Sequence, residues 1–177
     1  MPHKPKSKPT QTAAVPVATQ SPEATASRTF PIVGIGASAG GLAAIEAFFS
    51  GMHGMTVQVN CAYIIPPNRD MAFLNGTLQL LEPAAPRGHR LPIDFLFRSL
   101  AADLHERAIG IVLSGTGSDG TLGVRAIKAE GGMVMVQNPA SSEFDGMPQS
   151  ALATGLVDFE LPPAEMATQL MAYVSRA

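Results

Sequence analysis

The sequence predicts an α/β domain of three layers, in which a doubly wound, mostly parallel sheet lies between two layers of helices. Strand patterns that are apolar along their whole length alternate with helical patterns, which is typical of strands covered on both faces. Glycine-rich turns lead from strand to helix at two points in this alternation. The composition agrees, because 46% of the 177 residues are hydrophobic and 15% are charged, enough apolar surface for one sizeable core.

The first 28 residues differ from the rest of the chain in composition. They are rich in Pro, Ala and Thr, and their prolines interrupt any helix. We therefore expect residues 1–28 to form a disordered tail before a domain over residues 29–177. The net charge of −2 argues against a nucleic-acid partner. Cys61 is the single cysteine, which excludes an intrachain disulfide and a cysteine metal cluster.

The chain carries no pattern typical of membrane insertion or secretion. No apolar run approaches about 18 residues, the length expected of a spanning helix. The lysines near the N-terminus are not followed by the apolar segment of a secretory signal. We expect a cytoplasmic protein that is not membrane-inserted.

The sequence of the first half of the domain predicts two strands, one helix and a hairpin. An apolar strand is expected over Pro31–Gly36, a helix over Leu42–Phe49 and a second strand over Cys61–Ile65. Asn75-Gly76 then separates two short apolar runs, Met71–Leu74 and Thr77–Leu81. Asn-Gly between such runs is a strong signal for a small β-hairpin.

The second half predicts three further strands, each followed by a helix, after a helix that Pro92 opens. That first helix runs to about Glu106, with an apolar stripe of Ile93, Leu96, Phe97, Leu100 and Leu104. The expected strands are Ala108–Leu113, Met133–Gln137 and Leu156–Leu161. The expected helices are Thr121–Glu130, Pro148–Thr154 and Ala164–Val174.

The turn over Gly34–Gly41 fits three functional patterns to different degrees. A phosphate-binding P-loop is excluded, because no Gly-Lys-Ser/Thr follows. Gly34-x-Gly36-x-x-Ala39 fits a dinucleotide-binding fingerprint, but no acidic residue occurs between Glu46 and Asp70 to bind a ribose. Gly36-Ala-Ser38-Ala-Gly40 fits the G-x-S-x-G turn that exposes a nucleophilic serine. The alternative for Ser38 is an N-capping role in a tight turn.

A second strand–turn–helix segment, Ile109–Gly120, has the same organisation. Its Asp119 follows a strand as Ser38 does, and in open α/β sheets sites form at the carboxyl ends of the strands. A carboxylate there can orient a general base, as the acid of a Ser-His-Asp triad does. Asp is also a good helix N-cap, so both roles remain open for Asp119.

The four histidines do not complete a triad in an evident way. His3 lies in the tail, His53 in a turn and His89 before the Pro92 helix. His105 is expected near that helix's C-terminus, where it contacts the helix dipole favourably. No histidine follows Asp119, so the usual α/β-hydrolase order of serine, acid and histidine is absent.

Five ordered motifs resemble one known family. The domain is similar to the catalytic domain of chemotaxis protein-glutamate methylesterases, and most similar to the version fused to a receptor methyltransferase. The motifs are Ile35-Gly-Ala-Ser-Ala-Gly-Gly41, Tyr63-Ile-Ile-Pro-Pro-Asn-Arg69, His89-Arg-Leu-Pro-Ile-Asp-Phe95, Leu113-Ser-Gly-Thr-Gly-Ser-Asp-Gly120 and Glu143-Phe-Asp-Gly-Met-Pro148.

This resemblance implies hydrolysis of γ-glutamyl methyl esters on the cytoplasmic helices of methyl-accepting chemoreceptors, and deamidation of receptor glutamines. It implies Ser38 as nucleophile, Asp119 as triad acid and the Thr116 N–H as an oxyanion donor. His89 matches a histidine near the family's site, and Ala39 stands where many members have threonine. No cofactor or metal is implied, and a receptor methyltransferase is a further implied partner.

The sequence departs from the family after Met52. The segment that carries the family's triad histidine, about one βα unit, has no counterpart there, and His53 has neighbours that match a later turn. Loss of a triad member can reduce the rate by about 10⁴- to 10⁶-fold. The alternative is therefore an inactive remnant, or a non-catalytic module that binds receptors or the methyltransferase.

Overall fold

A computed structural model of the chain describes residues 32–41, 43, 44, 47, 69–83, 85, 86 and 89–176. The predicted tail, the predicted strand Cys61–Ile65 and the predicted deletion after Met52 lie outside these residues, as do His3 and His53. Over the described residues, no helix combines the length and apolar character needed to cross a bilayer.

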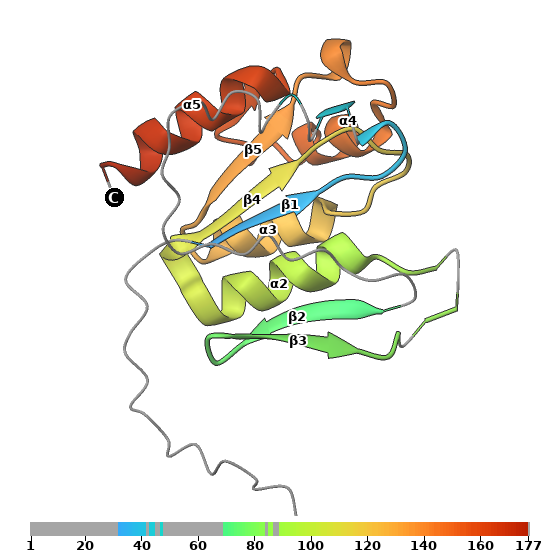
Figure 1. The fold of residues 1–177 in the computed structure, drawn as a ribbon, viewed down its shortest axis with the longest axis vertical. Coiled ribbons are helices and arrows are strands. Elements are labelled where there is room, and N and C mark those ends of the chain that lie inside the picture. The colour runs from blue at the N-terminus through green and yellow to red at the C-terminus, as the bar shows by residue number, and fades with distance from the viewer. Residues whose placement is uncertain are drawn as a thin grey trace, which may run out of the picture.

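A four-stranded parallel sheet forms the centre of the described domain (Figure 1). Its order is β1-β4-β5-β6, and β1 pairs with β4 in register from Ile32 opposite Ala108 to Gly36 opposite Val112. Every residue of β4 and β5 is buried, as their almost wholly apolar sequences predicted. The strands are β1 (Ile32–Gly36), β4 (Ala108–Val112), β5 (Met133–Gln137) and β6 (Phe159–Leu161).

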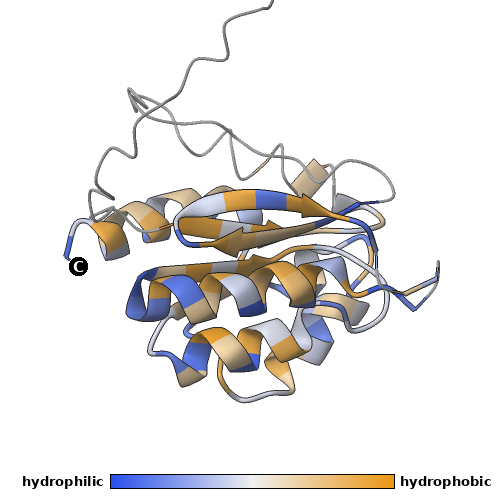
Figure 2. Ribbon diagram, turned by 90° about the horizontal axis from the view of Figure 1, so that it is seen from below, coloured by the Kyte–Doolittle hydropathy of each residue, from blue (hydrophilic) through white to orange (hydrophobic). Residues whose placement is uncertain are grey.

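Helices cover both faces of this sheet, which confirms the three-layer prediction. Alternate residues of the strands point to opposite layers. Figure 2 shows that the helices carry both hydrophobic and hydrophilic residues. One layer consists of α2 (Pro92–Leu104), α3 (Thr121–Ala129) and α4 (Gly146–Leu152), which pack on Val112, Val134 and Val136. On the other face, Ala44 and α5 (Pro163–Val174) pack on Ile109, Ile111, Met133 and Met135.

The helix after β1 is described only at Gly41, Ala43, Ala44 and Ala47, all of which are helical. These positions agree with the predicted helix over Leu42–Phe49, most of which lies outside the described residues.

Phe97 packs directly on glycines, which brings α2 close to the sheet. A Cβ at Gly34 would lie 3.0 Å from the Phe97 ring, and one at Gly110 would lie 3.1 Å from it. On α3, Gly123 faces the Cβ of Phe97 in the same manner. The absence of side chains at these three positions therefore lets α2 contact β1, β4 and α3 together.

The predicted hairpin is present and packs on α2. Its strands, β2 (Asp70–Leu74) and β3 (Thr77–Leu81), are antiparallel. Asn75 and Gly76 have φ values of 49° and 73°, as a tight hairpin turn requires. Their N–H groups donate to the Asp103 carboxylate at 2.8 and 3.0 Å, which fixes the turn against the C-terminal half of α2.

Two predicted elements begin two or three residues away from their predicted first residue. The last strand begins at Phe159 rather than Leu156, and Asp158 instead accepts the Val134 N–H with its carboxylate, 2.8 Å away. Helix α4 begins at Gly146, so Pro148 lies in its first turn, where the missing N–H costs no hydrogen bond. Two short 3₁₀ turns, η1 (His105–Arg107) and η2 (Pro139–Ser141), were not expected.

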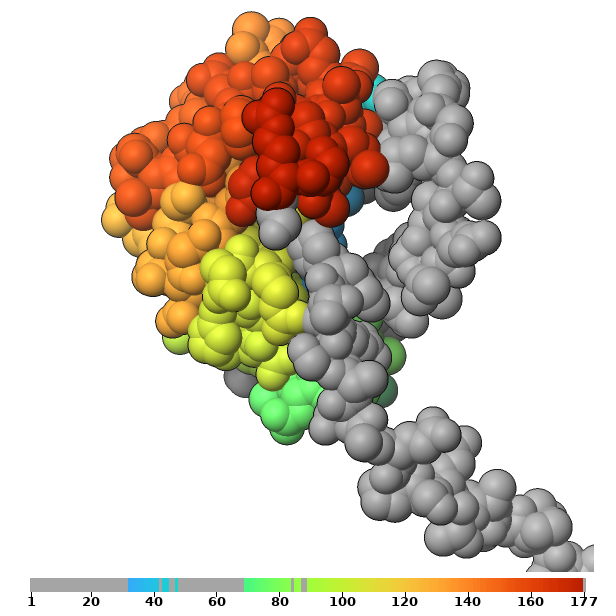
Figure 3. Space-filling view, turned by 90° about the vertical axis from the view of Figure 1, so that its left-hand side faces the viewer, coloured from blue at the N-terminus to red at the C-terminus, as the bar shows by residue number. Residues whose placement is uncertain are grey.

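The carboxyl ends of β1 and β4 point to the same edge of the sheet, because the two strands are parallel. The turns that follow them carry Ser38 and Asp119. The amino ends of the strands lie at the opposite end of the molecule, where Figure 3 shows α5 and the end of α2 at the surface.

Candidate active site

Ser38 lies exposed in the turn that follows β1. Its N–H donates to the Ser114 carbonyl at 3.0 Å, and its carbonyl accepts the Gly41 N–H at 2.9 Å. Gly40 has φ 70°, a backbone conformation that favours glycine. No hydrogen bond from the Ser38 hydroxyl to another described residue is present, so the capping alternative has no support in this part of the chain.

Gly115 brings the backbone of the second turn against Ser38. A Cβ at Gly115 would lie 2.8 Å from the Cβ of Ser38 and would overlap the sulfur of Met147. The Gly115 N–H donates to the Phe144 carbonyl at 3.0 Å. Thr116 is the next residue and is exposed, and its N–H donates to no described residue. An N–H donor adjoining an exposed serine is the arrangement that an oxyanion site needs.

A buried polar network centred on Ser114 holds the Ser38 turn in place. The Ser114 hydroxyl accepts the Phe144 N–H at 3.0 Å and lies 3.2 Å from the carbonyls of Ala39 and Phe144. The Ser114 N–H donates to the Gln137 side-chain oxygen at 2.7 Å, and the Gln137 amide donates to the Ser141 carbonyl at 2.9 Å. Both Ser114 and Gln137 are buried. The network therefore joins the Ser38 turn to the end of β5 and to the loop before α4.

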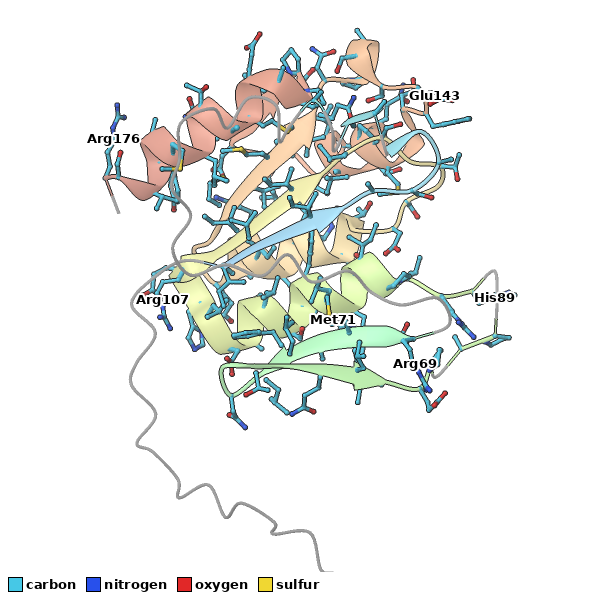
Figure 4. The ribbon with its side chains drawn as sticks, viewed as in Figure 1. Arg69, Met71, His89, Arg107, Glu143 and Arg176 are labelled. Carbon is cyan, nitrogen blue, oxygen red and sulfur yellow. The ribbon has the colours of Figure 1, made fainter. Side chains whose placement is uncertain are left out.

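Glu143 lies against the Ser38 turn from this same loop. A Cβ at Gly40 would lie 2.7 Å from the Cβ of Glu143, so the two residues are in close contact. Figure 4 labels Glu143 well apart from His89, which lies on the segment that precedes α2.

Asp119 contacts the beginning of α2 rather than a histidine within the described residues. Its carboxylate oxygens accept the N–H groups of Ile93 at 3.1 Å and Asp94 at 2.9 Å. Burial raises the pKa of the Asp119 carboxyl, and the negative charge of Asp94 adds to that rise. The hydrogen bonds from Asp94, Ile93 and Gly120 oppose it.

The capping alternative for Asp119 is therefore realised, but on a different helix from the one expected. The N-cap position of α3 is occupied by Gly120, with φ 96° and no side-chain cap. Asp119 instead caps α2, a helix that begins 27 residues earlier in the chain.

Neither histidine in the described part of the chain contacts Ser38 or Asp119. His89 is exposed, and its backbone N–H donates to the Pro86 carbonyl at 3.2 Å. His105 follows α2, as expected, and its ring nitrogen Nδ1 lies 2.7 Å from the Glu130 carboxylate. The structure thus brings Ser38, Ala39 and the segment containing Thr116 together, and leaves His89 apart from them.

Three residues of this region were missed by the sequence interpretation. Ser114 and Asp94 lie inside motifs quoted above, and Gln137 ends a predicted strand. A polar residue directly after or at the end of a buried strand is the signal that could have singled out Ser114 and Gln137. Asp94 lies on the mainly apolar first turn of a helix, and its 4% exposure could have been inferred from that position.

Comparison with known proteins agrees with this architecture. A family model described as CheB methylesterase matches residues 51–170, a segment that contains His89, Thr116 and Asp119 and begins after Ser38. The crystal structure of the Thermotoga maritima CheB methylesterase catalytic domain superimposes with a TM-score of 0.72 at 22% identity, covering 82% of this chain and 100% of that one. That likeness confirms the α/β fold.

Curated relatives share higher identity over shorter stretches. A protein-glutamate methylesterase/protein-glutamine glutaminase of Moorella thermoacetica is 41% identical over 48% of this chain and 20% of its own length. A second such protein, from Anaeromyxobacter dehalogenans, is 37% identical over 70% of this chain and 36% of its own length.

A 104.1 kDa uncharacterised protein of Rhodobacter capsulatus is 43% identical over 69% of this chain and 13% of its own length. The chain thus spans little more than a third, or less, of the curated relatives it matches. Because the family model covers more than half of the sequence, the chain belongs to the CheB methylesterase family.

Proposed function

We propose that this chain is a protein-glutamate methylesterase and glutamine deamidase domain that acts on methylated chemoreceptors in the cytoplasm. The observation that carries the proposal is the exposed Ser38 on a turn joined to Ser114, adjoined by the Thr116 N–H, which donates to none of the described residues. An activated hydroxyl beside preorganised N–H donors is suited to acyl transfer.

The chemistry proceeds through an acyl-enzyme. The Ser38 oxygen attacks the γ-carbonyl of a glutamyl methyl ester, and the Thr116 N–H stabilises the negative oxygen of the tetrahedral intermediate. The carbon–oxygen bond to the methoxy group breaks, and methanol leaves with one proton. Water then hydrolyses the acyl-enzyme, which releases glutamate and restores the serine. A receptor glutamine follows the same course and releases ammonia.

The remaining site residues have proposed roles in this reaction. Asp119 is the triad acid, and its N–H partners on α2 fix its carboxylate at the strand edge where Ser38 lies. Ala39 contacts the substrate beside Ser38, and His89 contacts it from the segment before α2, apart from the Ser38 turn. The partners are the cytoplasmic helices of chemoreceptors and a receptor methyltransferase, with no nucleic acid and no organic cofactor.

A second candidate is a non-catalytic module that binds receptors or the methyltransferase. Two observations favour it. Neither His89 nor His105 contacts Ser38, and both oxygens of Asp119 already accept backbone N–H groups. In this second function the chain keeps the family fold, but no side chain accepts the proton of the Ser38 hydroxyl.

Release of methanol separates the two candidates. Membranes that carry methylated chemoreceptors are incubated with the purified chain, with its Ser38→Ala variant and with a Ser175→Ala variant altered at an exposed serine on α5's C-terminal side. The enzyme proposal expects methanol from the wild type and Ser175→Ala, and none above background from Ser38→Ala. Equal methanol from all three excludes Ser38 as nucleophile. Background methanol from all three, with co-sedimentation of the chain on the receptor membranes, supports the binding module.

A further inference from the structure

Two aspartates hold the first turns of α2 and α3 against each other. Asp119, which precedes α3, accepts the N–H groups of Ile93 and Asp94 at the start of α2. Asp94, in the first turn of α2, accepts the Gly123 N–H in the first turn of α3 at 2.7 Å. Each helix therefore supplies N–H donors to a carboxylate associated with the other. We call these three hydrogen bonds the aspartate clamp.

The clamp satisfies groups that are otherwise costly to bury. Asp94 is only 4% exposed, and a buried carboxylate is tolerated when it is hydrogen-bonded. The free N–H groups of a helix's first turn carry partial positive charge, which stabilises a carboxylate placed there. Gly123 lies against Phe97, so the two helices are also in van der Waals contact one turn further on.

We propose that Asp94 is a positioning residue that fixes the Asp119 carboxyl at the strand edge by tying α2 to α3. The catalytic part of this inference rests on the proposed role of Asp119. Asp94 touches neither Ser38 nor its turn among the described contacts, so its influence passes through Asp119. Without the Asp94 carboxylate, the first turn of α2 loses its side-chain hydrogen bond to α3, and the two N–H donors that orient Asp119 are held less firmly.

The electrostatic setting makes this arrangement measurable. Among the described residues, Asp94 is the charged group whose field acts on the Asp119 carboxyl, and it raises the pKa of that carboxyl, as burial also does. Removal of the Asp94 charge therefore lowers the pKa of Asp119. The Asp94→Asn variant removes the charge but keeps a side-chain oxygen for the Gly123 N–H. The Asp94→Ala variant removes both.

Asp103 provides a matched control on the same helix. Its carboxylate also accepts two consecutive backbone N–H groups, but they belong to the hairpin turn at Asn75 and Gly76. Asp103→Ala removes the same charge as Asp94→Ala, and it removes two backbone hydrogen bonds where Asp94→Ala removes one, away from Asp119.

The test follows the Asp119 carboxyl by NMR titration in the whole chain, together with the amide signals of residues 93, 94 and 123. In the wild type, the amides of residues 93 and 94 shift as Asp119 titrates. In Asp94→Asn the pKa of Asp119 falls, and these amides still follow its titration. In Asp94→Ala they no longer follow it, and the Gly123 amide exchanges faster with solvent. An Asp94→Ala titration identical to those of the wild type and Asp103→Ala overturns the clamp, with folding of each variant checked by thermal unfolding.

Methanol release tests the positioning role of Asp94 independently of the NMR titration. Methanol release is expected to fall by about 10- to 100-fold in Asp94→Ala, since small misplacements of reacting groups cost that much. On an Asp119→Ala background the same substitution is expected to have no further effect, because Asp94 acts through Asp119. An undiminished additional loss there overturns the positioning role. A wild type without methanol release overturns the proposed function, and the NMR titration still decides the clamp.

Discussion

The Ser38 turn and the Asp119 turn begin from the same local pattern and differ in where their functional side chains point. Each follows a parallel strand, β1 or β4, and each enters a helix through glycine. Ser38 is exposed, whereas both oxygens of Asp119 accept N–H groups from α2. The same strand–turn–helix pattern can therefore leave one side chain exposed and use another to join two helices.

This difference has an energetic counterpart. The Ser38 side chain makes no hydrogen bond with the described residues, so its removal changes little in the folded state. The residues around it, Ser114 and Gly115, are buried and have specific contacts with α4 and its preceding loop. The contacts that stabilise the fold are thus made by the residues behind the Ser38 turn rather than by the Ser38 side chain. Substitutions at Ser114 and Gly115 are therefore expected to destabilise the fold more than removal of the Ser38 hydroxyl.

The largest effect is expected from Gly115→Ala. The new methyl group would overlap the Met147 sulfur and press on the Cβ of Ser38, so the turn or α4 must move. We expect the free energy of unfolding to fall by about 3 kcal/mol, within the range for overpacked sites. Chemical denaturation measures the change, and methanol release is expected to fall with it.

Gly155→Ala is the matched control for that substitution. Gly155 has a positive φ, 68°, which Gly115 does not, and a Cβ at Gly155 would meet nothing within 4 Å. The Gly155→Ala substitution is therefore expected to lower the free energy of unfolding only through backbone strain, by about 1 kcal/mol, and to leave methanol release unchanged. Equal losses in the two variants would show that contact with Ser38 and Met147 is unimportant.

A smaller effect is expected from Ser114→Ala. The Phe144 N–H loses its acceptor, and the link between Ala39 and the loop before α4 is removed. We expect a loss of about 1–2 kcal/mol in the free energy of unfolding, typical of a buried donor left without a partner. Ser175→Ala, at an exposed hydroxyl that donates to the Ala172 carbonyl, is expected to change it by less than about 0.5 kcal/mol. A Ser114→Ala variant as stable as Ser175→Ala would show that the network does not hold the turn.

The smallest effect is a pH dependence of stability from Asp119. Burial is the main reason why the pKa of the Asp119 carboxyl in the folded chain is raised above its ordinary value of 3.8. Between the ordinary pKa and the raised pKa, the folded state therefore binds more protons than the unfolded state. The contribution of Asp119 to stability therefore decreases as pH rises through this window and is constant above it. The difference in unfolding free energy between the wild type and Asp119→Asn should show this slope. A difference that increases with pH across the window would contradict the assigned direction.

The sequence was sufficient for features that depend on local pattern. The strand Met133–Gln137 has its predicted bounds, and the Asn75-Gly76 turn lies between the predicted hairpin strands. Continuous apolar runs such as Ala108–Val112 identified buried parallel strands because a strand covered on both faces has no polar alternation. The family motifs likewise located Ser38 and Asp119 on neighbouring turns.

Features that depend on distant contacts could not be predicted in the same way. Asp94 and Gly123 are separated by 29 positions, and their hydrogen bond exists only because Phe97 packs α2 against α3. Asp119 caps α2 rather than α3, and this arrangement also depends on the packing of the two helices. The predicted place of His53 in a turn stays a prediction, since that residue lies outside the described part of the chain.

The most direct test of the account is covalent labelling of Ser38, the proposed nucleophile. The whole chain is treated with a fluorophosphonate, which reacts with activated serines, and the labelled peptide is mapped by mass spectrometry. We predict one phosphonyl group per chain, attached to Ser38, and no labelling of Ser38→Ala. A wild-type chain that remains unlabelled while a known serine hydrolase in the same tube reacts, or a label on another serine, would contradict the proposal that Ser38 is an activated nucleophile.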